Sequence, residues 1–375
     1  MNKTTLDRPL RILHTESSTG WGGQEIRILT EARGMLERGH QVTLLTPACG
    51  DIFPAAQKLG VPVVDVPLLK KRPRDLLALY RWCKAHRGEY DVINTHSSTD
   101  SWLAALVAQL LPGFPPILRT RHVSTAVNNA ATTRWLYARA TAHIVTTGEA
   151  LRQQLNRDNG LPLERMTSVP TGIDLARYAP RDQATLRAKL GVAERPTIGI
   201  VATLRDWKGH DYLLDAFAEL RQRHPDWQLL IVGDGPRRAH LEARVAAAGL
   251  NGQVRFVGNQ DNVEEWLPTF DLFTLPSYGD EGVPQGIMQA MASGLAVVST
   301  PVGAIGEAVV ADQTGLMVPP HDAAALGAAL ERLLTDAALR TRMADAGLRR
   351  ARERFGIARM LDAMETIFAQ VAAKR

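Results

Sequence analysis

The sequence predicts an α/β protein made of two doubly wound, Rossmann-like domains. Short apolar runs rich in Val and Ile alternate with longer stretches of helical period, which is typical of parallel sheets with crossover helices. The alternation occurs as two successive series, separated by a break at 171–196. A chain of 375 residues is long enough for two domains of ordinary size, so we expect two sheets facing one another across a cleft.

The first series contains seven strand candidates and the second contains six. They are 11–16, 42–47, 61–67, 92–97, 117–122, 143–148 and 166–170, then 197–204, 227–235, 254–259, 272–277, 296–301 and 315–320. Helical stretches such as 24–38 and 102–111 lie between them, and 339–371 has helical character throughout. These patterns place the first domain at 1–178 and the second at 179–352.

The composition narrows the class of protein. Two cysteines, without metal-ligand spacing, argue against a disulfide framework and favour a reducing cytosol. No uncharged apolar stretch is long enough for a spanning helix, and the first 16 residues do not resemble a secretory signal. We therefore expect a cytoplasmic protein. Lys and Arg outnumber Asp and Glu by 44 to 39, but no nucleic-acid-binding motif accompanies them, so an arginine-rich surface is the favoured interpretation.

In open parallel sheets, ligands bind beyond the carboxyl ends of the strands. After the first strand, Gly22 and Gly23 open a helix, where backbone N–H groups are available to a phosphate. A tight strand-to-helix turn explains such a loop equally well. His96 and His122 end the fourth and fifth strands, where they either pack in the core or contact sugar hydroxyls and move protons.

The second domain begins with a strand that ends in two cations. Arg205 and Lys208 precede a helix that starts near Gly209, and such a pair suits a diphosphate, with Arg as a fork and Lys as a point charge. The alternative is a solvated turn. After the next strand, Asp234 is a candidate cap for the following helix.

The densest candidate site is the run PSYGDEGVPQGIMQAMASG, from 276 to 294. Glu281 offers a carboxylate to paired sugar hydroxyls. The free N–H groups of Gln285 and Gly286 at the helix start would face an anion, and Gln289 follows on the first turn.

Taken together, these motifs resemble the retaining GT-B glycosyltransferases of family 4, the group 1 transferases. The resemblance spans nearly the whole chain: the GG loop followed by GHQVTLLTP, the strand-end His122, VPTGID, the KG turn, LLIVGDGP, VRFVGN, DLFTLPS, MASGLAVVSTPVGAIGE and GLMVPPHD. Each piece alone is weak, but their order and spacing are specific.

The resemblance implies an acceptor-binding first domain, a donor-binding second domain and a final helix, 353–375, that crosses back to the first. Gly22 and Gly23 would approach the donor phosphate or the acceptor. Arg205 and Lys208 would neutralise the diphosphate leaving group without a metal ion or other cofactor.

By the same resemblance, Glu281 would bind the donor sugar and His122 would contact it near the reacting carbon. His96 is a further candidate for the sugar or the ribose. The expected chemistry is front-face displacement with retention, using a nucleotide-sugar donor, with a UDP-sugar as the first choice. The acceptor would be a glycan or a lipid-linked saccharide of cell-surface polysaccharide or lipopolysaccharide synthesis.

Three departures from the family pattern concern the donor site. Gln289 replaces a second glutamate that grips the ribose, Pro284 removes a backbone N–H, and Ala202-Thr203-Leu204 stands where Gly-Arg-Leu is usual. Two alternatives remain open. One is a non-hydrolysing nucleotide-sugar epimerase on the same fold, and the other is a weakened nucleotide-sugar binder.

The basic segment 70–87 carries Leu, Tyr and Trp at helical intervals. An ordinary crossover helix with its apolar stripe in the core is the favoured interpretation. Peripheral attachment to an anionic membrane at the cytoplasmic face is the second hypothesis.

Overall fold

The computed structural model describes residues 8–123, 125–279 and 281–373. The expectation about the N-terminal stretch falls partly on residues 1–7, which lie outside the described residues. The chain divides into two compact units, one formed by residues 1–172 with 357–375 and the other by residues 173–356.

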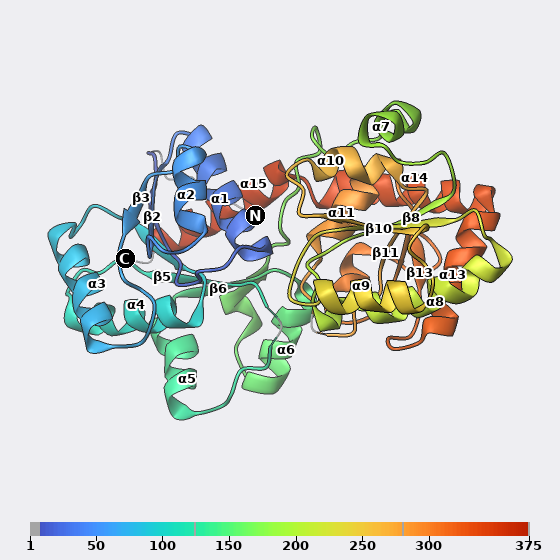
Figure 1. Cartoon of the computed structure of the whole chain (residues 1–375). Coiled ribbons are helices and arrows are strands. Elements are labelled where there is room, and N and C mark those ends of the chain that lie inside the picture. The colour runs from blue at the N-terminus through green and yellow to red at the C-terminus, as the bar shows by residue number, and fades with distance from the viewer. Residues whose placement is uncertain (1–7, 124, 280, 374–375) are drawn as a thin grey trace. The chain divides into compact units, whose positions relative to one another are not determined.

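Unit 1 is a seven-stranded parallel sheet with helices on both faces (Figure 1). Its strands are β1 (Arg11–Thr15), β2 (Gln41–Thr46), β3 (Val63–Asp65), β4 (Val92–Thr95), β5 (Ile117–Arg121), β6 (His143–Thr146) and β7 (Met166–Ser168). Its helices are α1 (Gly23–Glu37), α2 (Ile52–Lys58), α3 (Pro73–Ala85), α4 (Ser98–Leu110), α5 (Ala131–Trp135), α6 (Glu149–Asn159) and α15 (Ile357–Ala372), with a π-helical turn at Leu136–Ala140 and a 3₁₀ turn at Leu163–Arg165.

Alternate residues of each strand supply the two faces of this sheet. Ile12 of β1 belongs to the core shared with α1, α2 and α15, whereas its neighbour Leu13 belongs to the core shared with α3 and α4. Both faces are buried, which explains why the strands appear as continuous apolar runs.

Unit 2 is a six-stranded parallel sheet. Its strands are β8 (Thr197–Val201), β9 (Gln228–Val232), β10 (Val254–Gly258), β11 (Leu272–Leu275), β12 (Val297–Ser299) and β13 (Gly315–Met317). Its helices are α7 (Gln183–Leu190), α8 (His210–Arg223), α9 (Arg238–Ala247), α10 (Val263–Trp266), α11 (Gln285–Ala292), α12 (Ile305–Ala308), α13 (Ala323–Thr335) and α14 (Ala337–Arg354), with 3₁₀ turns at Asp206–Lys208 and Leu267–Thr269.

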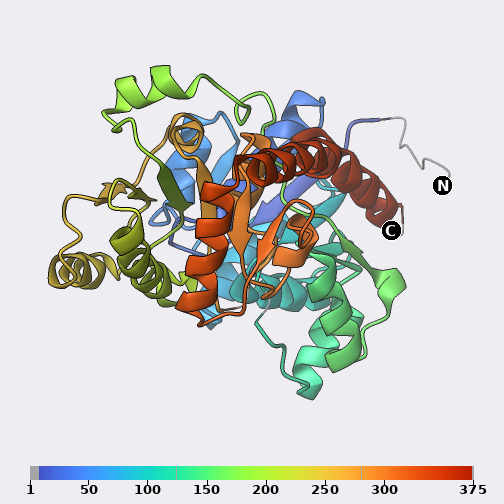
Figure 2. The same ribbon diagram turned by 90° about the vertical axis from the view of Figure 1, so that its right-hand side faces the viewer.

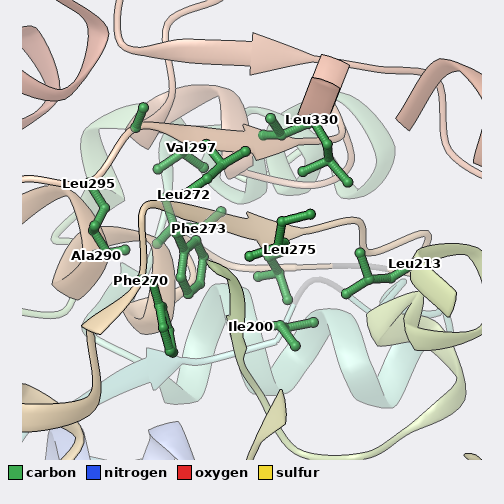
Figure 3. Close-up of a cluster of buried hydrophobic side chains, with 14 of the residues drawn as sticks. Ile200, Leu213, Phe270, Leu272, Phe273, Leu275, Ala290, Leu295, Val297 and Leu330 are labelled. Carbon is green, nitrogen blue, oxygen red and sulfur yellow. The ribbon is translucent and has the colours of Figure 1, made fainter. Parts of the chain in front are cut away.

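The core of unit 2 joins strands β8, β11 and β12 to the helices on both faces. Figure 3 shows Phe273 of β11 and Ile200 of β8 among the side chains of this cluster, with Leu330 of α13. Phe270 packs so closely on Gly199 that a Cβ at residue 199 would lie 2.0 Å from the Phe270 ring, so only glycine fits there.

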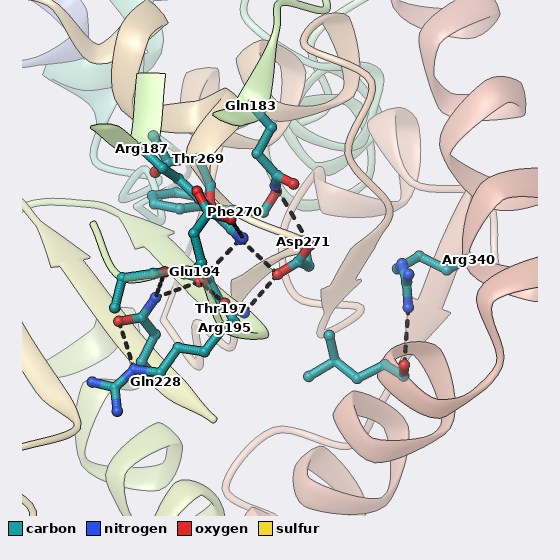
Figure 4. A network of polar contacts seen from close by, with 12 residues as sticks. Gln183, Arg187, Glu194, Arg195, Thr197, Gln228, Thr269, Phe270, Asp271 and Arg340 are labelled. Atoms are coloured by element: carbon teal, nitrogen blue, oxygen red, sulfur yellow. Dashed lines mark hydrogen bonds and ion pairs between the residues drawn. The ribbon is translucent and has the colours of Figure 1, made fainter. Parts of the chain in front are cut away.

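A polar network lies at the amino-terminal ends of the strands of this sheet, opposite their carboxyl ends (Figure 4). The Arg187 guanidinium of α7 donates to Asp271 Oδ2 at 2.8 Å and to the Thr269 carbonyl at 3.0 Å. Asp271 also accepts the Thr197 N–H at 2.7 Å. These contacts fix α7 against the starts of β8 and β11, so we treat the network as structural.

The end of the chain differs from the prediction. The continuous helix predicted over 339–371 is two helices, α14 and α15, because the chain turns at Phe355 and Gly356, where Ile173 N donates to the Phe355 carbonyl at 2.7 Å. This contact also ties Ile173 to unit 2, so the units divide at residues 172 and 356 and not at 178 and 352.

Helix α15 returns to unit 1 and packs beside α1, as Figure 2 also shows. A Cβ on Gly34 of α1 would lie 2.4 Å from the Leu361 side chain, so glycine allows the two helices to approach closely. The buried Arg27 of α1 donates to the Val169 carbonyl at 2.6 Å and contacts Met364 of α15.

Strand order determines where each unit offers a ligand site. The order is β3-β2-β1-β4-β5-β6-β7 in unit 1 and β10-β9-β8-β11-β12-β13 in unit 2. The direction of winding therefore reverses between β1 and β4, and between β8 and β11. At such switch points the loops diverge beyond the carboxyl ends of the strands and leave room for a ligand.

Candidate functional site

In unit 2, the turn after β8 is locked to the strand end of β11. The 3₁₀ turn Asp206–Lys208 leads into Gly209, which has φ +76° and precedes α8. A Cβ at 209 would lie 1.9 Å from the Pro276 carbonyl oxygen, so both the backbone conformation and the space require glycine. The close approach brings Lys208 beside the loop that follows β11.

Lys208 and Glu281 form an ion pair at this switch point. The distance from Lys208 Nζ to Glu281 Oε1 is 2.6 Å, and the Ser277 hydroxyl donates to the same oxygen at 2.7 Å. Glu281 is 8% exposed. Its backbone carbonyl accepts the Ala304 N–H at 2.9 Å, and a Cβ on Gly303 would lie 2.1 Å from that carbonyl oxygen. Lys208 and Ser277 thus hold one oxygen of the carboxylate, and the backbone of Glu281 is fixed against residues 303 and 304.

The start of α11 lies next to the end of β8. A Cβ on Gly286 would be 2.8 Å from the Val201 carbonyl oxygen, so Gly286 allows this approach. Pro284 precedes the helix, and Gln285 and Gly286 provide its first N–H groups. Gln289 is half-buried on the next part of the same helix, and within the described residues its side chain has no hydrogen-bond partner.

Arg205 belongs to the same turn but is exposed. Its guanidinium stacks over the Trp207 ring at 5.3 Å, and Trp207 is itself 39% exposed. The sequence predicted Arg205 and Lys208 as a pair of cations, and the structure separates them into one exposed cation and one that is bound to a carboxylate.

The helix-capping prediction for Asp234 is wrong. Its carboxylate accepts the Gly235 N–H at 2.7 Å, and α9 begins only at Arg238. Arg237 occupies the N-cap position without a side-chain capping bond, so the aspartate shapes the turn and reaches the helix only as an ion pair with Arg238 at 3.7 Å.

In unit 1, Glu16 organises the loop that follows β1. The sequence pattern did not predict a role for this residue. This fully buried carboxylate accepts the Ser17 and Ser18 N–H groups at 2.7 and 2.6 Å, and also hydrogen-bonds Gln24 and Ser97. Burial raises its pKa. These hydrogen bonds join the ends of β1 and β4. The position of Glu16 directly after a buried strand was the sequence feature that could have identified it.

Gly22 and Gly23 follow this loop at the start of α1. Gly22 has φ −172°, an extended conformation open to any residue, and a Cβ there would meet only Glu25, at 3.6 Å. No contact with the described residues of unit 1 therefore requires glycine at 22. The two glycines lie at the helix start that the sequence predicted, and their role toward a phosphate stays a prediction.

His96 and His122 are joined, together with His14, in a chain of hydrogen-bonded imidazoles. The distance from His96 Nδ1 to His122 Nε2 is 2.9 Å, and that from His14 Nδ1 to His96 Nε2 is also 2.9 Å. His14, on β1, was not predicted. It points inward on a strand where periodicity alone cannot distinguish a packed histidine from a functional one.

Burial lowers the pKa of each of the three histidines, that of His14 to about 3, which favours the neutral form of all three rings at neutral pH. A neutral imidazole has one donor and one acceptor nitrogen, so the tautomer of one ring fixes the other two. If His122 donates from Nε2, then His96 donates to His14, and His14 carries its hydrogen on Nε2, which lies 4.0 Å from Glu31 Oε1. His122 then keeps Nδ1 as an acceptor.

The described residues include no group of three or more His, Cys, Asp or Glu side chains arranged to hold a metal ion. Among the helices in the described part of the chain, none combines the length and apolar character needed to cross a membrane.

Two parallel, doubly wound units are the architecture of the GT-B fold. Two family models match the chain: Glycosyltransferase Family 4 over residues 21–177 and Glycosyl transferases group 1 over residues 195–336. D-inositol 3-phosphate glycosyltransferase of Nocardia farcinica is 30% identical over 370 residues, which cover 88% of this chain and 80% of that protein. The chain therefore belongs to the family 4, group 1 glycosyltransferases.

Other relatives agree with this assignment. Lipopolysaccharide core biosynthesis mannosyltransferase LpsB of Rhizobium meliloti is 30% identical, covering 83% of this chain and 88% of its own. The crystal structure of Anabaena HepE in complex with UDP matches with a TM-score of 0.85 at 20% identity, covering 96% of this chain and 100% of that one. This last likeness confirms the predicted fold.

Proposed function

We propose that the protein transfers a sugar from a nucleotide-diphosphate sugar to a glycan or lipid-linked acceptor, with retention at the anomeric carbon and without a metal ion. The observation that carries this proposal is the Lys208–Glu281 ion pair at the switch point of unit 2, beside the start of α11. It offers a cation to a diphosphate and a carboxylate to sugar hydroxyls within one small site.

Arg205 and Lys208 would bind the diphosphate, together with the N–H groups of Gln285 and Gly286. Glu281 would accept hydrogen bonds from the donor sugar. Gln289 would reach the ribose, since an amide can both donate and accept. Arg205 is exposed and Lys208 is 18% exposed at its side chain, so both are accessible to a ligand from solvent.

In the proposed reaction, the bond between the anomeric carbon and the diphosphate oxygen breaks as the acceptor hydroxyl attacks from the same face. The leaving phosphate oxygen takes the proton of that hydroxyl, so a separate base is not needed. Lys208 and Arg205 stabilise the negative charge that develops on the diphosphate. We assign His122 to the sugar being transferred and regard His96 and His14 as residues that set its tautomer.

A UDP-sugar is the first choice of donor, supported by the UDP bound in the HepE structure. The description of LpsB supports a cell-surface glycan as the product class. A cytoplasmic location follows from these substrates. Attachment of α3 to an anionic membrane is a further hypothesis, supported by Leu77, which is 45% exposed on that basic helix. Flotation with anionic liposomes tests it, and absence of binding would dismiss it.

The test of the proposed function is a Lys208→Ala variant. We expect donor turnover to fall roughly ten- to a thousandfold, because the developing charge loses a nearby cation. A Lys189→Ala variant is the matched control, since Lys189 forms an exposed pair with Glu265 at 2.7 Å elsewhere in unit 2. Release of nucleotide diphosphate is measured across UDP-, GDP- and ADP-sugars. Unchanged turnover in Lys208→Ala would overturn the assignment.

A further inference from the structure

Arg119 is a buried cation without an anionic partner. It lies on β5 and is 4% exposed, and its Nε and Nη1 atoms are buried with no hydrogen-bond partner among the described residues. Its guanidinium stacks on the Tyr137 ring at 4.4 Å. Burial of an unpaired charge is strongly unfavourable, so a position like this is normally paired or replaced by an apolar side chain.

The neighbouring buried arginines in unit 1 each donate hydrogen bonds, although the Nε atom of each is also buried without a hydrogen-bond partner among the described residues. Arg27 donates to the Val169 carbonyl at 2.6 Å, and Arg121 donates to the Tyr137 hydroxyl at 2.7 Å and to the Thr125 carbonyl at 2.6 Å. Asp100 interacts electrostatically with Arg119 without a hydrogen bond to it. The Asp100 carboxyl group already accepts hydrogen bonds from Thr15, His96 and Ser97. Asp100 is therefore already engaged, and among the described residues Arg119 forms no ion pair.

A second cation lies close to Arg119. Lys71 Nζ donates to the Ser98 hydroxyl at 3.3 Å and lies 5.6 Å from the centre of the Trp102 ring. Burial and repulsion from Arg119 together lower the pKa of Lys71. Lys71 is exposed and therefore accessible to a ligand, and within the described residues it has no acidic partner either.

Aromatic side chains border these cations. The Trp102 and Trp135 rings stack with their centres 6.0 Å apart, and Tyr137 follows in the π-helical turn Leu136–Ala140. Irregular helical turns of this kind are frequent at functional sites. Aromatic faces with a few charged groups are typical of small-molecule sites. We call Lys71, Ser98, Trp102, Arg119, Trp135 and Tyr137 the Arg119 cluster.

The Arg119 cluster lies where an acceptor is expected. Arg119 pairs in register with Thr95, the last residue of β4, and Ser98 begins the helix that follows β4. His96, in the middle of the imidazole chain, lies between these two positions in the sequence. The cluster is thus beside the switch point of unit 1.

We propose that the Arg119 cluster is a subsite for an anionic group, phosphate or carboxylate, carried by the acceptor. The inference rests on the proposed function, because it assumes that unit 1 binds an acceptor sugar. Arg119 and Lys71 pair with the oxyanion, and the tryptophans contact the apolar face of the sugar that bears it. Empty, the site keeps an unpaired charge, and the bound acceptor removes that penalty.

Binding of defined probes tests the proposal. The thermal stability of the full chain is measured with D-glucose 6-phosphate, D-glucuronate, inorganic phosphate and D-glucose, in a Lys208→Ala background that weakens phosphate binding in unit 2. We expect at least one anionic probe to stabilise the protein and glucose to have no effect. A response to the phosphates or to glucuronate identifies the anion, and no response to any of the three overturns the proposal.

Variants separate the subsite from the rest of the protein. Arg119→Met and Lys71→Ala should each weaken the anionic probe at least about tenfold, whereas Arg81→Ala, which removes an exposed cation from α3, should not. Arg119→Met should also be as stable as the parent without ligand, because it removes an unpaired buried charge. Equal probe affinity in the Lys71 and Arg119 variants and the parent would refute the subsite.

Binding of UDP to the unmodified chain is measured in parallel. Failure of UDP to bind would count against the proposed function, whereas the response to the anionic probes tests the subsite alone.

Discussion

The buried imidazole chain predicts a specific pH dependence of the stability of unit 1. His14 has a pKa of about 3 in the folded protein, against about 6.5 in an unfolded chain. Below pH 6.5 the unfolded chain therefore binds a proton that the folded protein does not. The contribution of His14 to stability is present above that pH and is lost as the pH falls toward 3.

The magnitude follows from the linkage relation. Full uptake of one proton by the unfolded chain changes the free energy of unfolding by about 1.4 kcal/mol per pH unit, so between pH 7 and pH 5 His14 costs about 2 kcal/mol. Glu31 and Asp100 act in the opposite direction, since their pKa values are raised to about 7 and they stabilise the fold as the pH falls. These opposing effects mask the contribution of His14 to the pH dependence of the free energy of unfolding, so a variant is needed to isolate that contribution.

His14→Asn is that variant, because the asparagine amide lies near the position of Nδ1 but does not titrate. Relative to the parent, its stability should improve by about 2 kcal/mol between pH 7 and pH 5. Hydrogen exchange of the β1 and β4 amides reports the free energy of opening unit 1. Ile12→Val is the control and should lose about 0.5–1.5 kcal/mol equally at both pH values. Identical pH dependence of His14→Asn and the parent would refute the buried, neutral state of His14.

Two further predictions concern the donor site. Gly209→Ala should reduce donor affinity and destabilise unit 2 by more than about 1 kcal/mol, because φ is +76° and the new Cβ would be 1.9 Å from the Pro276 carbonyl oxygen. Nucleotide titration measures the affinity and thermal unfolding measures the stability. An unchanged affinity would contradict the role of this turn. Gln289→Glu should leave turnover within about tenfold of the parent if the protein is already an active transferase, whereas a large gain from near zero in a turnover assay would indicate a weakened binder.

The sequence predicted the strands well because parallel strands buried on both faces are continuous apolar runs. It also placed His96 and His122 at strand ends, Lys208 just after one and Glu281 in the loop that follows another. The structure brings Lys208 to Glu281 and His96 to His122. It did not predict His14, because the hydrogen bond that joins it to His96 spans 82 residues of sequence.

The same limit applies to Glu16 and Arg119. Both are buried polar residues on or beside strands, where local pattern gives no information about partners. Glu16 is satisfied by four groups that come from three segments of the chain. Arg119 is conspicuous only once the structure shows that such partners are missing. Absence of a contact cannot be inferred from sequence spacing.

The two charged sites differ in how they exist without a ligand. At the donor site, Lys208 and Glu281 neutralise one another at 2.6 Å, and among the described residues Arg205 remains as the unpaired cation. Under the proposed function, a donor must separate this pair, with the diphosphate binding Lys208 and the sugar hydroxyls binding Glu281. A ligand that offers only one of the two groups leaves the other charge half-buried and unpaired, which is costly. Under the proposed function, the ion pair favours an intact nucleotide sugar over a free sugar, whereas Arg119, which has no such partner among the described residues, favours an anionic acceptor over a neutral one.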